Sequence, residues 1–241
     1  SRHESYRSYG VYARSPLQNK EQRRVFNFHE WIKYKPSFCS VFLYFNFMIR
    51  LFIFLLLGIG FSSLGQTSKT MHNFEEFGWT ITIPNGFEAV NEAEWAKIED
   101  RGVKAIEDIH GEQLINQTTT LFVYRNTQFN VFESNNQPFN ENVDGNWIAS
   151  CKEVNDIVFE TFEAQMPNIP LDSASSVETI AGRKFQTFMV KVDLPNGMQL
   201  KALMFSTLYP NLKKELTISI TSVDDVQLEK MLSAFRNSKF K

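Results

Sequence analysis

Cys151 and His110 are the first residues in this sequence whose types suit chemistry. A cysteine thiolate is a nucleophile and a histidine can serve as its base, so the two together would suit covalent catalysis. A reactive cysteine needs a setting that stabilises the thiolate, such as a helix N-terminus or a nearby cation. Cys151 falls one turn inside a predicted helix, on its apolar side, where core packing is the simpler interpretation. His110 falls at a predicted helix C-terminus, where a capping role is the simpler interpretation.

A second candidate is a cation site in the pattern Asn140-x-Asn142-x-Asp144-Gly145. These residues reproduce the first half of a calcium-binding loop. The position where such a loop places a bidentate glutamate is Cys151, and an asparagine replaces the first aspartate. We therefore interpret the segment as a turn that starts a helix, and we expect no metal.

Residues 127–146 form a long segment without clear periodicity, and we predict that it is mostly loop with at most a short strand. It interleaves Phe129, Phe132 and Phe139 with asparagine and glutamine side chains. Exposed aromatic rings among amides can form a contact surface for sugar rings or for another protein. These three phenylalanines are therefore the predicted binding residues, although such rings more often anchor their own loop on a sheet.

The rest of the sequence contains no glycine-rich phosphate loop, no paired-carboxylate signature and no Ser-His-Asp grouping. A catalytic triad dispersed along the chain would not be visible in this way. We therefore expect no cofactor and assign no catalytic residue.

Hydrophobic periodicity predicts the elements that position these residues. Predicted strands cover residues 77–84, 118–125, 175–180, 183–194, 198–209 and 213–221. Predicted helices cover residues 91–111, 147–166 and a last segment from about residue 224, whose buried side is expected to hold Val226, Met231, Leu232 and Phe235. Turn signals such as Leu194-Pro195-Asn196-Gly197 are too short for a crossover, so the last four strands must pair antiparallel. The sequence thus predicts an α+β fold, an antiparallel sheet flanked by helices.

The stretch MIRLFIFLLLGIGFSSLG, residues 48–65, has the parts of a secretory signal. Arg50 supplies the basic start, residues 51–61 the apolar run, and Ser63 and Gly65 the small positions before a cleavage point. Cleavage there would remove residues 48–65 as a signal peptide. The expected product is a secreted or periplasmic single domain.

An uncleaved membrane anchor is the alternative. Apolar character reaches upstream to Phe38, so the segment 38–61 exceeds the roughly 20 residues that a span requires. Arg50 near its middle would cost about 2.5 to 3.5 kcal/mol on insertion. If residues 38–65 stay attached, the domain would be membrane-anchored and face outside the cytoplasm. Residues 1–47 are basic and lack periodicity, and we interpret them as disordered or as not part of the true protein.

Charge divides the sequence into two parts. Residues 66–241 contain 16 Lys+Arg and 24 Asp+Glu, a net charge of −8, whereas the preceding residues are basic. A domain this acidic, without a basic stripe, is a poor match for a phosphate backbone. We expect no nucleic-acid partner.

The order of elements and two edge motifs resemble the PsbP-like superfamily of α/β/α sandwiches. The motifs are FGWTITIPNGF, an opening strand that ends at a proline, and MLSAFRNSKF, a closing helix, with a meander of long strands between them. The chain is also similar to exported proteins of Bacteroidetes-type bacteria. Members of the superfamily serve mainly as binding or accessory proteins, so the resemblance implies a non-enzymatic role without transferring any site residue.

Three functional hypotheses follow. The first is an exported, non-enzymatic binding or accessory protein whose partner is a protein or a cell-envelope component. The second is an envelope hydrolase whose catalytic residues are dispersed in the sequence. The third is a membrane-anchored structural protein.

Overall fold

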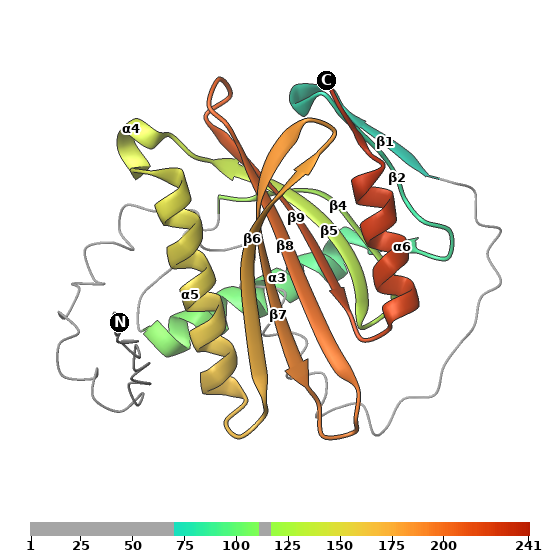
Figure 1. The fold of residues 1–241 in the computed structure, drawn as a ribbon, viewed down its shortest axis with the longest axis vertical. Coiled ribbons are helices and arrows are strands. Elements are labelled where there is room, and N and C mark those ends of the chain that lie inside the picture. The colour runs from blue at the N-terminus through green and yellow to red at the C-terminus, as the bar shows by residue number, and fades with distance from the viewer. Residues whose placement is uncertain (1–69, 111–116) are drawn as a thin grey trace, which may run out of the picture.

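Residues 70–110 and 117–241, the part of the chain described by the computed structural model, contain a seven-stranded antiparallel sheet (Figure 1). Across the sheet the strand order is β3-β4-β5-β9-β8-β7-β6. The strands are β3 (Glu88–Ala89), β4 (Thr119–Thr127), β5 (Asn130–Pro138), β6 (Leu171–Ile180), β7 (Arg183–Asp193), β8 (Gln199–Tyr209) and β9 (Lys214–Ser222). The antiparallel α+β fold predicted from the sequence is confirmed. The four long strands β6 to β9 follow one another along the chain and pair in that order, as their short turns require.

A smaller sheet joins the two ends of the described domain. Its order is β1-β2-β10, with β1 (Met71–Phe74), β2 (Trp79–Thr82) and β10 (Lys239–Phe240), and the short 3₁₀ helix η3 (Glu75–Phe77) connects the first two strands. Trp79 stacks on Phe240 with ring centroids 5.7 Å apart, and its indole N–H donates to Ser238 Oγ at 3.0 Å. The strand predicted over residues 77–84 therefore belongs to a separate sheet. The sequence did not predict β1, β3 or β10, which are only two to four residues long.

Helices cover both faces of the large sheet. On one face lie α3 (Glu92–His110) and α5 (Trp147–Gln165), and on the other lie α6 (Asp225–Arg236) and the small sheet (Figure 1). The alternation of β4 shows the two sides: Val123 packs with Trp95 of α3, whereas its neighbour Phe122 packs in the cluster that contains Phe235 of α6. The helices thus cover the apolar side chains of both faces.

Aromatic side chains dominate the core under α6. Phe235 has no exposed surface and meets Phe185 and Phe205 edge-on, with ring centroids 5.3 and 4.9 Å apart. Leu228, which lies seven residues before Phe235, packs on the same side of the helix. The prediction that Val226 is buried is wrong, because Val226 points away from this side and is 64 % exposed.

The prediction that residues 127–146 are mostly loop is also wrong. β5 lies inside the sheet and pairs antiparallel with β4 on one edge and β9 on the other. Its sequence hides the strand, because the buried side chains of β5 include polar ones that break the apolar alternation.

The calcium-like pattern that follows β5 forms a helix start. The side chain of Asn140 accepts a hydrogen bond from the Asn142 backbone N–H and caps the short helix α4 (Glu141–Asp144). In return, the Asn140 backbone N–H donates to Asp144 Oδ2 at 2.7 Å. Asn140 and Asp144 are thus hydrogen-bonded to the backbone at the start of the helix, which agrees with the interpretation of this pattern as a helix-start turn.

Truncation of the core aromatic of α6 tests this packing. We expect Phe235→Ala to lower the free energy of unfolding by about 3 to 5 kcal/mol, because it leaves a cavity among the rings of Trp79, Phe185 and Phe205. Val226→Ala on the exposed side of the same helix is the control, with an expected change within about 0.5 kcal/mol. Urea unfolding followed by circular dichroism measures both. Equal stability of the two variants would contradict the assigned orientation of α6.

Candidate functional site

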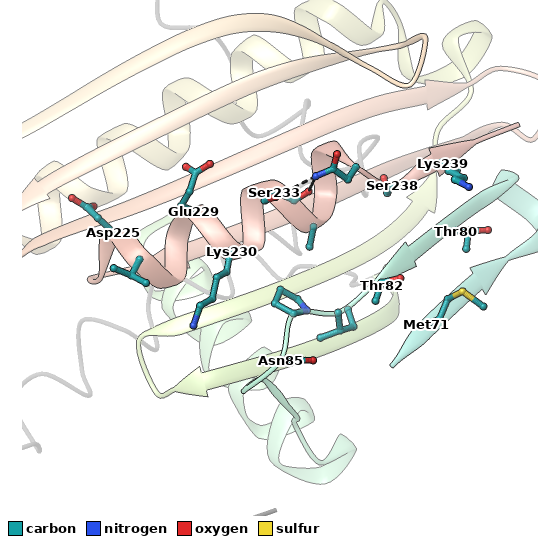
Figure 2. Close-up of a pocket in the computed structure, with 15 residues that line it drawn as sticks. Met71, Thr80, Thr82, Asn85, Asp225, Glu229, Lys230, Ser233, Ser238 and Lys239 are labelled. Carbon is teal, nitrogen blue, oxygen red and sulfur yellow. Dashed lines mark hydrogen bonds between the residues drawn. The ribbon is translucent and has the colours of Figure 1, made fainter. Parts of the chain in front are cut away.

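A groove of about 1080 Å³ lies between α6 and the small sheet (Figure 2). The alternation of β2 creates one wall, because Trp79 and Ile81 face the core while Thr80 and Thr82 line the groove. The lining residues come from four segments and are mixed in polarity. They are Met71, Thr80, Thr82, Ile83, Pro84, Asn85, Asp225, Val226, Glu229, Lys230, Ser233, Ala234, Asn237, Ser238 and Lys239.

The groove combines exposed apolar side chains with charges of both signs. Met71 and Val226, which both line the groove, are 68 % and 64 % exposed, and exposed apolar side chains in a groove can contact a partner. Figure 2 shows Lys230 directed from α6 toward the segment that carries Asn85, whereas Glu229 points to another side of the helix. The lining contains no histidine and no cysteine, the two residue types that the sequence offers most plainly for covalent catalysis.

The structure separates the three phenylalanines predicted to bind a ligand. Phe132 and Phe139 are 0 % and 1 % exposed, so they belong to the core and do not form an exposed surface. Phe132 lies on β5 and packs edge-on against Phe122 of β4. Phe129 is partly buried and packs at the edge of the α5 core. Whether Phe129 contacts a ligand stays a prediction.

A buried polar strip runs along β5 and β9 on the face of the sheet that α3 and α5 cover. It comprises Glu133, Asn135 and Gln137 of β5 and Glu215, Thr217 and Ser219 of β9. Within it, Asn135 Nδ2 donates to Glu133 Oε1, and Gln137 Nε2 donates to Glu215 Oε2, both at 2.8 Å. Burial raises the pKa of Glu133 to about 8, the Asn135 hydrogen bond opposes this rise, and the negative charge of Glu99 adds to it. Burial also raises the pKa of Glu215, although the Gln137 hydrogen bond opposes that rise. Burial therefore disfavours the charged form of both carboxyl groups, and a pKa of about 8 keeps Glu133 mostly neutral at physiological pH.

Cys151 borders this strip from α5 and is buried. Burial raises the pKa of its thiol, and the nearby Glu215 carboxyl adds to the rise, so the thiolate needed for nucleophilic attack is disfavoured. The cavity beside it has a volume of about 20 Å³, which is about the size of one water molecule. Cys151 thus lies where a substrate would not fit, as the core-packing interpretation describes. His110 is the last residue of α3, and its side chain lies outside the described part of the chain.

Comparison with known proteins gives matches among solved structures and none by sequence. The sequence matches no protein-family model and no curated protein. Among solved structures, the chain is similar to the solution structure of cyanobacterial PsbP (CyanoP) from Synechocystis sp. PCC 6803, with a TM-score of 0.45 and 11% sequence identity over 76% of this chain and 98% of that chain. A match this distant transfers neither a site nor a partner to this chain. The resemblance to exported Bacteroidetes-type proteins stays a prediction.

Two further findings bear on the sequence predictions. No helix in the described ranges, 70–110 and 117–241, has the length and apolar character needed to cross a membrane. The predicted signal segment, residues 48–65, and the alternative anchor, residues 38–65, lie outside those ranges.

Sequence reasoning did not find the groove, because its residues come from segments far apart in the chain. A usable signal was present in α6, where Val226, Lys230 and Ser233 recur at helical spacing opposite the apolar side. The partner wall could not be found in the same way. It depends on the pairing of β2 with β1 and β10, and these two strands are too short to be recognised.

The raised pKa of Glu133 predicts how stability depends on pH. The folded protein binds the Glu133 proton more tightly than the unfolded chain, so stability is highest below the unfolded pKa of about 4.5 and falls as pH rises toward about 8. Glu133→Gln keeps the oxygen that accepts from Asn135 and removes the titration. In the wild type we expect the urea midpoint to decrease between pH 4.5 and pH 8. In Glu133→Gln this decrease should be smaller, and the part that remains should come from Glu215.

The control is Glu163→Gln on the exposed side of α5, which should keep the full wild-type pH dependence. Urea midpoints measured at several pH values compare the three chains. An identical pH profile for wild type and Glu133→Gln would show that the Glu133 carboxyl does not lose its proton across this range.

Proposed function

We propose that this chain is an exported, non-enzymatic binding or accessory protein that holds a partner protein in the groove between α6 and the small sheet. The observation that carries the proposal is the groove itself, about 1080 Å³ in volume and lined by exposed Met71 and Val226. The export part rests on the signal-like sequence of residues 48–65.

The composition of the groove favours a polypeptide over a small molecule or a bilayer. Protein interfaces combine apolar contacts at the centre with a polar rim. Here the hydroxyl and amide groups of Thr82, Ser233 and Asn237 share the lining with the apolar side chains of Val226 and Ala234, and Asp225 and Lys239 supply charges of opposite sign. A surface with hydrogen-bonding groups and both charge signs suits a partner chain that presents the same mixture.

The hydrolase hypothesis requires a cluster of titratable groups that a substrate can reach. Two carboxyl groups with raised pKa values, Glu133 and Glu215, lie in the buried polar strip, and the cavity that Glu215 lines is too small for a substrate. The groove, which a substrate could enter, is lined without histidine or cysteine. These observations support binding over hydrolysis.

Site-specific photocrosslinking in the native cells tests the groove. A benzophenone amino acid placed at Val226 should form one discrete crosslinked species with a partner protein. The matched control places the same group at Val177, which is 57 % exposed on the edge strand β6 and outside the groove. Lys230→Glu should weaken the Val226 crosslink, because it reverses the charge directed into the groove. Equal crosslinking from both positions, or none from Val226, would refute the proposed site.

N-terminal sequencing of the protein recovered from its native cells tests export. We expect the mature chain to begin at Gln66, because Ser63 and Gly65 provide the small residues that precede cleavage. The soluble extracytoplasmic fraction should then contain the chain. A chain that retains Met48 and remains in the membrane fraction would contradict the cleaved signal and support the anchor.

A further inference from the structure

A basic recess lies beside the turn that joins β6 to β7, at the same end of the molecule as the C-terminus (Figure 1). It has a volume of about 520 Å³. The side chains that give it its character are three cations, two aromatic rings and a hydroxyl: Arg183, Lys184, Lys241, Trp147, Phe240 and Thr207. None of its lining residues is an aspartate or a glutamate, and none is shared with the groove.

This concentration of positive charge stands out in a domain with a net charge of −8. Five other cations of the domain lie against carboxylates, in the pairs Arg125–Glu94, Lys152–Asp156, Lys201–Asp225, Lys214–Glu76 and Arg236–Glu178. Within the described part of the chain, no carboxylate forms an ion pair with Arg183, Lys184 or Lys241. Their charge is therefore available to an anion that enters the recess.

The guanidinium of Arg183 is held in place for such a contact. Its Cζ lies 3.8 Å from the centroid of the Tyr209 ring, and the Tyr209 hydroxyl is itself fixed because it donates to the Phe77 carbonyl at 2.9 Å. Stacking on a ring leaves the N–H groups in the guanidinium plane free to bind an oxyanion. Arg183 Nε is buried and donates to no described group, so contact with an anion falls to the terminal N–H groups of the guanidinium.

The turn before Arg183 fixes where these cations stand. Ala181 and Gly182 have φ values of 47° and 83°, so both central residues of the turn are left-handed, as a tight two-residue hairpin requires. A Cβ built at Gly182 would meet nothing within 4 Å, so the backbone of the turn is open on that side. The hairpin thus fixes the backbone that carries Arg183 and Lys184 at the start of β7, and the two side chains leave opposite faces of the strand there.

We propose that the basic recess binds a phosphate group carried on an aromatic or similar ring-shaped body. A phosphate monoester carries a charge of about −1.5 to −2 at pH 7, which matches three cations better than a single carboxylate does. The edge of the Arg183 guanidinium can bind two phosphate oxygens at once. Trp147 and Phe240 supply ring surfaces for the body, and the volume lies in the range of about 300 to 1,000 Å³ found for small-molecule sites.

Calorimetric titration of the purified full chain with phenyl phosphate tests the site, with inorganic phosphate and phenol as comparison probes. We expect phenyl phosphate to bind more tightly than either comparison probe, and its affinity to fall with added salt. Arg183→Gln should raise the dissociation constant at least about tenfold, because it removes the bidentate contact. Lys184→Gln and Lys241→Gln, both at exposed positions, should each weaken binding by a smaller factor.

Lys97→Gln, at an exposed position of α3 outside both the recess and the groove, is the matched control and should leave the dissociation constant unchanged. Circular dichroism confirms the fold of each variant, and the two exposed lysine variants carry the test if Arg183→Gln does not fold. Absence of phenyl phosphate binding, or equal binding by wild type and the recess variants, overturns the proposal. Equal affinity for inorganic phosphate and phenyl phosphate overturns the ring part of it. Because the recess and the groove share no residue, these outcomes are independent of the crosslinking result.

Discussion

Backbone hydrogen bonding of β5 to β4 on one side and to β9 on the other joins the two halves of the large sheet. The strands on the β4 side carry the residues that meet α3, and the strands on the β9 side carry most of those that meet α5 and α6. If β5 were absent, β3 and β4 would lose their connection to the rest of the sheet, and the aromatic cluster under α6 would lose Phe132 and its contact with Phe122. The pairing of one strand thus supports both faces of the domain.

The two faces of β5 meet different surroundings, although both carry buried polar side chains. On the face toward α6, Phe132 is fully buried among aromatic rings, and this burial favours folding. On the other face, Glu133, Asn135 and Gln137 are at most 4 % exposed, which costs free energy unless the groups are hydrogen-bonded and uncharged. Two amide-to-carboxyl hydrogen bonds and the raised pKa of Glu133 reduce that cost. The strand can therefore be polar and still lie inside the sheet.

This duality also explains which parts of the structure the sequence predicts. The strands β7 and β8, the helix α5 and the hairpin at residues 194–197 follow from apolar periodicity and turn residues, because one physical pattern determines each of them. β5 does not, because its inward-facing amides and carboxyls look like a solvated loop until the neighbouring strand and helices are known. The sequence could identify Phe132 as an unusual aromatic residue but could not show that it belongs to the core.

The candidate sites are harder still to predict, for a related reason. The groove needs β1 and β10, two- to four-residue strands whose pairing depends on tertiary contacts, and the basic recess brings Arg183 together with Lys241 across 58 residues of sequence. Residue type alone marks Cys151 and His110 as chemical candidates, yet burial removes the reactivity of the thiol. Accessibility, which sequence periodicity does not report, decides what each group can do.

The contact between Trp79 and the last strand has a consequence for biogenesis. The hydrogen bond from Trp79 to Ser238 spans 159 residues, so β2 cannot complete its sheet or bury its indole until almost the whole chain is present. Contacts this distant in sequence form late, because closing long loops is entropically costly. If the chain is exported as proposed, the sheet β1-β2-β10 would therefore be completed only after β10 has left the translocation channel. The pairing of β10 with β2 would then be one of the last steps of folding.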